Sequence, residues 1–183
     1  MKDRNVIAHF GTGLGKTFIA MLSAKHFLEL HNSKAGQVLI IVPTITLTQQ
    51  HCRSFETNSL TSAYSAKAVS AFGSNASTSA LNSILDAHII IATHGAILDL
   101  YRHYKDIFNI KQISLLVLDE CHHAGSSNHG YSQFMQEIYW KVDDKDRPRV
   151  LGLTASPCFN FDVKNLDEQI GKFINSIFYH ISC

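Results

Sequence analysis

The sequence predicts an α/β domain in which a mostly parallel sheet carries helices on both faces. Short aliphatic runs alternate with longer helix-like segments along the 183 residues. These runs are continuous rather than alternating, as in strands buried on both faces, and no close hairpin signals join them. With 45% hydrophobic and 17% charged residues, the chain has enough apolar material for one core, so we expect a single domain over residues 1–183.

The first strand, expected at residues 6–10, runs into a glycine-rich turn that opens the first helix, expected at residues 17–30. Glycines let backbone N–H groups close around an anion at the start of a helix. Lys16 can reach the β- and γ-phosphates of a nucleotide, and the Thr17 hydroxyl can bind Mg²⁺. The strict pattern G-x-x-x-x-G-K-[ST] requires glycine where this chain has Phe10. We still interpret the turn as a phosphate-binding loop, formed by Gly11, Thr12, Gly13, Leu14, Gly15, Lys16 and Thr17.

The second strand is expected at residues 38–42, a continuous VLIIV run that Pro43 ends. Thr46 and Gln49 have the spacing of a capping box, which predicts a helix running toward Phe55. A strand followed directly by a helix is the repeating unit of a parallel α/β sheet.

Residues 57–83 are rich in Ser, Ala and Asn and give the weakest structural pattern in the chain. Within them we expect one strand at residues 68–72 and a short helix at residues 79–85. Residues 88–92 form the next buried run. A polar and aromatic segment around residues 101–108 separates that run from the following strand.

The run at residues 115–118 ends in two adjacent acids, Asp119 and Glu120. In a parallel sheet, this strand end lies at the edge from which the phosphate-binding loop leaves, and ligands bind there. We therefore expect Asp119 to hold Mg²⁺ and Glu120 to orient and deprotonate an attacking water. Acidic pairs also occur in ordinary turns, so this interpretation depends on the phosphate-binding loop upstream.

The remaining elements are two helices and a strand. An amphipathic helix is expected at residues 131–139, with a core-facing stripe of Tyr131, Phe134, Met135, Ile138 and Tyr139. A strand is expected at residues 150–153. Asn165 and Glu168 can cap a last helix whose apolar face is Ile170, Phe173, Ile174 and Ile177.

Composition limits the possible partners. The net charge is +1, so any contact with nucleic acid must be local to one face. Four cysteines without C-x-x-C pairs, and no signal peptide or long apolar segment, predict a reduced intracellular setting, the cytoplasm before the nucleus, with no membrane association. Adjacent residues rarely face one metal ion, so we do not expect zinc at Cys121, His122, His123 and His129.

Five motifs in order, GTGLGKT, IVPTITLTQQ, IIATHGAIL, LDECHHA and LGLTASP, resemble motifs I, Ia, Ic, II and III of the superfamily 2 helicases. The agreement extends over nearly the whole chain. The DECH form of motif II, with His129-Gly130-Tyr131 after it, is most similar to the helicase region of Dicer and the RIG-I-like RNA sensors. The resemblance implies a RecA-like P-loop fold and a motor lobe that hydrolyses ATP with Mg²⁺ and acts on double-stranded RNA.

The resemblance also implies roles for polar residues outside the loop. Thr154, Ala155 and Ser156 would connect the γ-phosphate, through His122, to nucleic-acid binding. Contacts to a nucleic-acid backbone would come from Pro43, Thr44, Gln50, Gly73 and Thr93. Hydroxyls and N–H groups at strand ends hold phosphates without reading bases, so a strongly basic patch is not required.

Some parts that the resemblance implies are not found in residues 1–183. Helicases of this superfamily bind ATP between two RecA-like lobes, and the second lobe supplies an arginine finger. Such a finger contributes about 10³–10⁵ in rate, so we expect the isolated chain to hydrolyse ATP very slowly. The adenine-reading glutamine upstream of motif I is also missing, which indicates a fragment or a truncated gene. The expected partners are RNA, the second lobe and, in a Dicer-type protein, ribonuclease III domains.

Two alternatives stay open. In the first, the chain is a catalytically weak module that binds nucleic acid or protein; the intact Lys16, Thr17, Asp119 and Glu120 argue against loss of catalysis by mutation but not by truncation. In the second, the motor is retained and acts on DNA.

Overall fold

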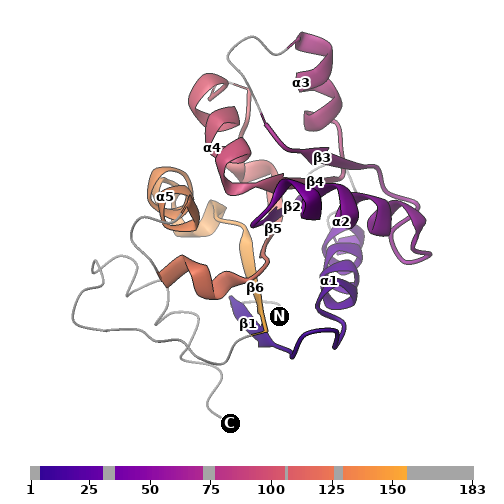
Figure 1. The fold of residues 1–183 in the computed structure, drawn as a ribbon. Coiled ribbons are helices and arrows are strands. Elements are labelled where there is room, and N and C mark those ends of the chain that lie inside the picture. Colours follow the sequence, from indigo (N-terminus) through magenta and orange to yellow (C-terminus); the bar gives the residue numbers. More distant parts are fainter. Residues whose placement is uncertain (1–4, 31–35, 72–76, 106, 126–129, 156–183) are drawn as a thin grey trace.

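The computed structural model describes residues 5–30, 36–71, 77–105, 107–125 and 130–155 (Figure 1). The strands are β1 (Val6–His9), β2 (Gln37–Val42), β3 (Ala66–Val69), β4 (Ile89–Thr93), β5 (Ile113–Leu118) and β6 (Arg149–Thr154). The α-helices are α1 (Lys16–Leu30), α2 (Ile45–Thr57), α3 (Thr78–Leu85), α4 (His94–His103) and α5 (Gly130–Glu137). Short 3₁₀ helices are η1 (Ile110–Gln112), η2 (Cys121–Gly125), η3 (Tyr139–Lys141) and η4 (Asp144–Asp146).

The strands of the described residues form one parallel sheet in the order β1-β6-β5-β2-β4-β3. Helices α1 and α2 cover one face, while α4 and α5 cover the other (Figure 1). The predicted α/β class is therefore confirmed.

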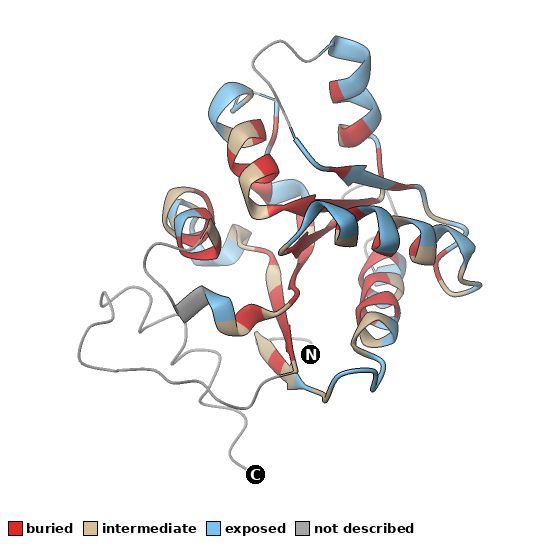
Figure 2. Cartoon of the chain, viewed as in Figure 1, coloured by how far each residue is buried: buried red, intermediate tan, exposed pale blue. Residues whose placement is uncertain are grey.

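The central strand β2 explains why the strand runs are continuously aliphatic. Its side chains alternate between two apolar layers: Leu39 and Ile41 pack on the α4 and α5 side, while Val38 and Ile40 pack on the α1 and α2 side. All four are fully buried, as the red central strands in Figure 2 show. Burial of each such side chain contributes about 1.5–3 kcal/mol, so both faces of this strand must be apolar.

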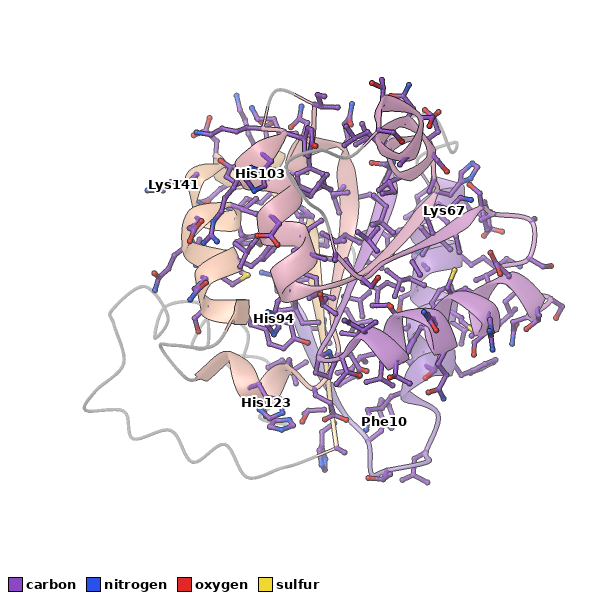
Figure 3. The ribbon with its side chains drawn as sticks, turned by 45° about the horizontal axis from the view of Figure 1, so that its top comes forward. Phe10, Lys67, His94, His103, His123 and Lys141 are labelled. Carbon is purple, nitrogen blue, oxygen red and sulfur yellow. The ribbon has the colours of Figure 1, made fainter. Side chains whose placement is uncertain are left out.

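All six strands of the described part run in the same direction, so their carboxyl ends share one edge of the sheet. Figure 3 shows Phe10, His94 and His123 toward this edge, and Lys67, His103 and Lys141 toward the other end of the molecule. The segments that follow β1, β4 and β5 thus lie along one edge of the sheet although they are far apart in sequence.

The predicted strand at residues 68–72 is wrong in its bounds, because β3 spans Ala66–Val69. Within the described residues this edge strand pairs with β4 alone, and Ala66 lies beside Ile89. Only Ala66 and Val69 of its four residues are buried. Such a strand lacks the continuous apolar run that identifies the central strands.

The predicted cap of the second helix is also wrong, because Thr44 rather than Thr46 is the N-cap of α2. The Thr44 hydroxyl accepts the N–H of Leu47 at 3.4 Å. Thr46 lies inside the helix.

Helix α4 occupies residues for which the sequence patterns gave no helix. The hydroxyl of Thr93 accepts the N–H of Ala96 at 3.2 Å, which caps the helix. Its buried residues are Ala96, Ile97, Leu98 and Leu100. A threonine cap followed by apolar residues three and four apart was the available signal.

The expected helix at residues 131–139 is an α-helix only as far as Glu137, and η3 follows it. Its apolar stripe is buried as predicted. The last expected helix, with Asn165 and Glu168, lies outside the described residues. Within the described part of the chain, no helix has the length and apolar character that a membrane span needs.

Candidate nucleotide-binding site

The loop between β1 and α1 has the backbone conformation expected of an anion cradle. Gly13 and Gly15 have left-handed φ angles of 80° and 89°, which favour glycine over all other residues. A Cβ at Gly13 would meet no atom within 4 Å, so the loop faces open space there. Helix α1 begins at Lys16, and its first N–H groups have no intrahelical partner. The chemistry of this loop fits phosphate.

Phe10, the departure from the strict loop pattern, belongs to the sheet edge. Its N–H donates to the carbonyl of Thr154 at 3.0 Å, which extends the pairing of β1 with β6. The glycines with left-handed φ angles lie three and five residues further on. The left-handed turns at these glycines therefore form with an aromatic residue at position 10.

The two acids after β5 follow a sharply turned backbone. The N–H of Asp119 donates to the carbonyl of Ile41 at 2.9 Å, which keeps Asp119 beside the end of β2. Glu120 has a φ of 50°, an uncommon value for a residue with a side chain. Such backbone costs about 1–3 kcal/mol and is concentrated at functional sites. The turn directs two neighbouring carboxylates into different surroundings.

Glu120 is held by groups from two distant segments and by a side chain two residues further along the chain. Its Oε1 lies 3.3 Å from Lys16 Nζ, so the loop and the acids share one edge of the sheet. On the other oxygen, Oε2 lies 3.4 Å from His122 Nδ1. The N–H of Ala155, just after β6, also donates to Oε2 at 3.4 Å.

His122 connects Glu120 to the end of β6. Its Nδ1 lies 2.9 Å from the Thr154 hydroxyl. Burial, with a smaller effect of neighbouring His123, lowers the pKa of His122. The structure thus brings together His122, Thr154 and Ala155, as the motif resemblance implies, while Ser156 lies outside the described residues.

Asp119 is buried, with 7% of its surface exposed. Burial raises the pKa of its carboxyl, against the opposing charges of His51 and Lys16. A carboxylate in such surroundings is stabilised by a nearby cation. The hydroxyl of buried Tyr131 donates to the carbonyl oxygens of Asp119 at 2.5 Å and Ile41 at 3.2 Å, so helix α5 fixes the ends of β5 and β2.

Two contacts of Asp119 were absent from the sequence predictions. The hydroxyl of Tyr131 was expected only as part of an apolar stripe, and His51 was not expected near the site. His51 Nε2 lies 3.7 Å from Asp119 Oδ2. Neither contact has a sequence signal, because both depend on which helices cross the end of β5.

The described residues contain no group of three or more His, Cys, Asp and Glu side chains that could hold a metal ion by themselves. Mg²⁺ is different, because it commonly binds one or two protein ligands together with nucleotide phosphates. Lys16 Nζ lies 3.3 Å from Glu120 Oε1. Thr17 is the residue after Lys16, and Asp119 is the residue before Glu120. Two residues with oxygen ligands, one from each of the segments that this contact joins, fit such a site.

The candidate nucleic-acid residues fall partly within the described residues. Thr93 lies beside Val42 in the sheet, which brings it next to Pro43 and Thr44. Gln50 lies on the exposed side of α2. Gly73 lies outside the described residues. The hydroxyls of Thr44 and Thr93 both cap helices.

Comparison with known proteins agrees with this geometry. Residues 1–162 match the family model of the DEAD/DEAH box helicases. The chain belongs to this family. The helicase domain is 36% identical over 172 residues to Dicer-like protein 2 of Cryphonectria parasitica, and the match covers 88% of the chain and 11% of that protein. It is 32% identical over 158 residues to endoribonuclease dcr-1 of Caenorhabditis elegans, covering 84% of the chain and 8% of that protein.

Solved structures show the same fold. The helicase domain of Pyrococcus furiosus Hef superposes with a TM-score of 0.68 at 30% identity, covering 96% of the chain and 33% of Hef. The UvsW helicase of bacteriophage T4, at 23% identity and a TM-score of 0.61, shows the fold alone. The chain is thus an ATP-binding domain of a superfamily 2 helicase of Dicer-like type, and it spans about a tenth of these Dicer-type relatives.

Proposed function

We propose that this domain is the motor lobe of a double-stranded-RNA-directed helicase or translocase that hydrolyses ATP with Mg²⁺. The observation that carries the proposal is the 3.3 Å contact between Lys16 Nζ and Glu120 Oε1. It brings a phosphate-binding cation and a candidate general base to one edge of the sheet. A nucleotide bound at the glycine loop would have its terminal phosphate next to both.

Each polar group has a role in this mechanism. The glycine loop and Lys16 bind the phosphates, and Thr17 and Asp119 would hold Mg²⁺, which neutralises charge that develops on the phosphate oxygens. Glu120 orients the attacking water and accepts its proton on a carboxylate oxygen. The contacts of Oε2 with His122 and with the Ala155 N–H keep this carboxylate in place.

RNA is the proposed track because of the relatives and the position of the candidate contacts. The matched relatives include a Dicer-like protein and an endoribonuclease. Pro43 and Thr44 follow strand β2, and Thr93 ends strand β4, at the edge that carries Asp119. Backbone N–H groups and hydroxyls at such helix starts suit the phosphates of a nucleic-acid backbone.

A second RecA-like lobe is part of the proposal, as are further domains in the full-length protein. This domain supplies the phosphate loop and the acids, while an arginine finger would come from the second lobe. Because a finger contributes about 10³–10⁵ in rate, the isolated domain is expected to turn over slowly.

The test is the ATPase rate of the full-length protein with double-stranded RNA and with duplex DNA of equal length. We expect RNA to stimulate hydrolysis more strongly than DNA. Stimulation by DNA alone would favour a DNA-directed motor. The absence of turnover with either would leave only a binding role.

A further inference from the structure

His51 is a buried polar side chain that the mechanism above does not use. It is 7% exposed and lies on the inward face of α2, between Thr48 and Phe55. Its Nδ1 is buried without a hydrogen-bond partner among the described residues. An unpaired buried polar atom costs about 1–3 kcal/mol. An apolar side chain would fill the same place without this cost, so packing does not explain a histidine there.

The other ring nitrogen faces the candidate metal-binding acid. Nε2 of His51 lies 3.7 Å from Asp119 Oδ2, although the two residues come from different elements. The second oxygen, Oδ1, accepts the N–H of Glu120 at 3.1 Å. The Asp119 carboxylate is therefore approached by a backbone donor on one side and by an imidazole on the other.

The surroundings of the ring select one arrangement of its proton. A proton on Nε2 points a donor at the carboxylate and leaves Nδ1 as a bare acceptor. A proton on Nδ1 would bury an N–H without an acceptor and set two acceptors, Nε2 and Oδ2, against each other. The first arrangement is lower in energy. The separation of 3.7 Å is longer than a direct hydrogen bond, so one of the two side chains would have to rotate to close it.

We propose that His51 is a positioning residue that orients the Asp119 carboxylate for Mg²⁺. This inference rests on the proposed function, because it assigns Asp119 to the metal. The His51 ring N–H facing Oδ2 and the Glu120 N–H at Oδ1 together fix the rotation of the carboxylate. The remaining lone pairs of both oxygens then keep one orientation in which they can bind Mg²⁺. Mutation of a group that hydrogen-bonds to a metal ligand typically lowers metal affinity by about 10–100-fold.

The experiment measures how Mg²⁺ affects the binding of a fluorescent ATP analogue to the 183-residue chain. For His51→Leu we expect the Mg²⁺ concentration at half-maximal binding to rise by about 10–100-fold. Binding of the analogue in EDTA is expected to stay unchanged. His51→Gln, whose amide can donate from a similar position, is expected to restore much of the Mg²⁺ affinity. His51→Asn is expected to resemble His51→Leu, because its side chain is too short to place a donor there. Gln49→Leu, on the exposed side of the same helix turn, is the matched control.

Several outcomes would overturn the inference. One is an unchanged Mg²⁺ dependence in His51→Leu; another is an equal loss of binding with and without Mg²⁺, which would assign His51 to packing alone. Thermal unfolding of each variant without ligand identifies a folding defect, and the polar variants His51→Gln and His51→Asn then decide. A wild-type chain that bound no nucleotide at all would instead overturn the proposed function, together with the role of His51.

Discussion

The carboxyl ends of β5 and β4 lie at the same edge of the sheet, yet their polar residues have different kinds of partner. After β5, the Glu120 carboxylate contacts Lys16 from the loop after β1 and the Ala155 N–H after β6. After β4, the Thr93 hydroxyl accepts the N–H of Ala96, three residues along the same helix.

This difference separates residues that build the fold from residues placed for chemistry. The contact of Thr93 satisfies an unpaired N–H at a helix start, so capping explains it. The contacts of Glu120 join segments that the sheet already holds together, and they accompany an unfavourable left-handed backbone. Strain and distant partners at Glu120 therefore indicate catalytic chemistry, while the capping contact of Thr93 indicates stability, separately from its proposed contact with RNA.

The largest expected effect is the loss of hydrolysis in Glu120→Gln. An amide cannot accept the proton of the attacking water, so we expect kcat of the full-length protein to fall by about 10²–10⁴-fold. Nucleotide binding should persist, because the phosphate loop is unchanged. Stability should change little, since ion pairs of partly exposed groups such as Lys16 and Glu120 contribute about 0–1 kcal/mol.

Phosphate release and binding of a fluorescent nucleotide measure these two properties separately. Lys16→Ala is the companion variant and is expected to lose binding itself. Normal turnover by Glu120→Gln would show that the base lies elsewhere, and the contrast between the two strand ends would lose its basis.

A smaller effect is expected where the end of β5 packs on β6. A Cβ on Gly152 would lie 2.8 Å from Cys121 Sγ and 3.1 Å from Ile7 Cγ1. Forcing an extra carbon into a packed core typically costs about 1–3 kcal/mol, so Gly152→Ala should lower the free energy of unfolding by that amount. Denaturant unfolding measures it.

Cys121→Ala provides the matched background for this substitution. It removes the closest atom, so Gly152→Ala should destabilise the Cys121→Ala chain less than the wild type. An equal loss in both backgrounds would show that Ile7 Cγ1 or Cys121 Cβ, at 3.1 and 3.3 Å, rather than Cys121 Sγ, makes the contact that matters. Because Cys121 directly follows Glu120, this packing is part of what fixes the position of the acid.

Much of the fold could be predicted from the sequence because its strongest signals are local. The VLIIV run of β2 and the glycines of the loop dictate structure through burial and backbone conformation. The position of both acids near the loop was predictable as well, because all parallel strands of one sheet end at the same edge.

The contact of His51 with Asp119 could not be predicted, because it depends on β5 lying directly beside β2 in the sheet. The two strands are separated in the chain by several other elements, so no single segment of the sequence shows that they are neighbours. Helix α4 was missed for another reason. The sequence patterns predict no element for most of its residues, although Thr93 and the apolar residues after it have the form of a capped helix.

The smallest expected effect is at the end of β4. Thr93→Ala removes the hydroxyl that accepts the Ala96 N–H, and loss of such a cap costs about 0.5–2 kcal/mol of stability. Thr93→Ser retains the oxygen and should remain close to the wild type. Denaturant unfolding measures the change, while kcat of the full-length protein with saturating RNA should stay the same, since Thr93 is not among the groups that contact Glu120. A variant that kept its stability but lost hydrolysis would contradict this contrast, because Thr93 would then act as Glu120 does despite having only a local partner.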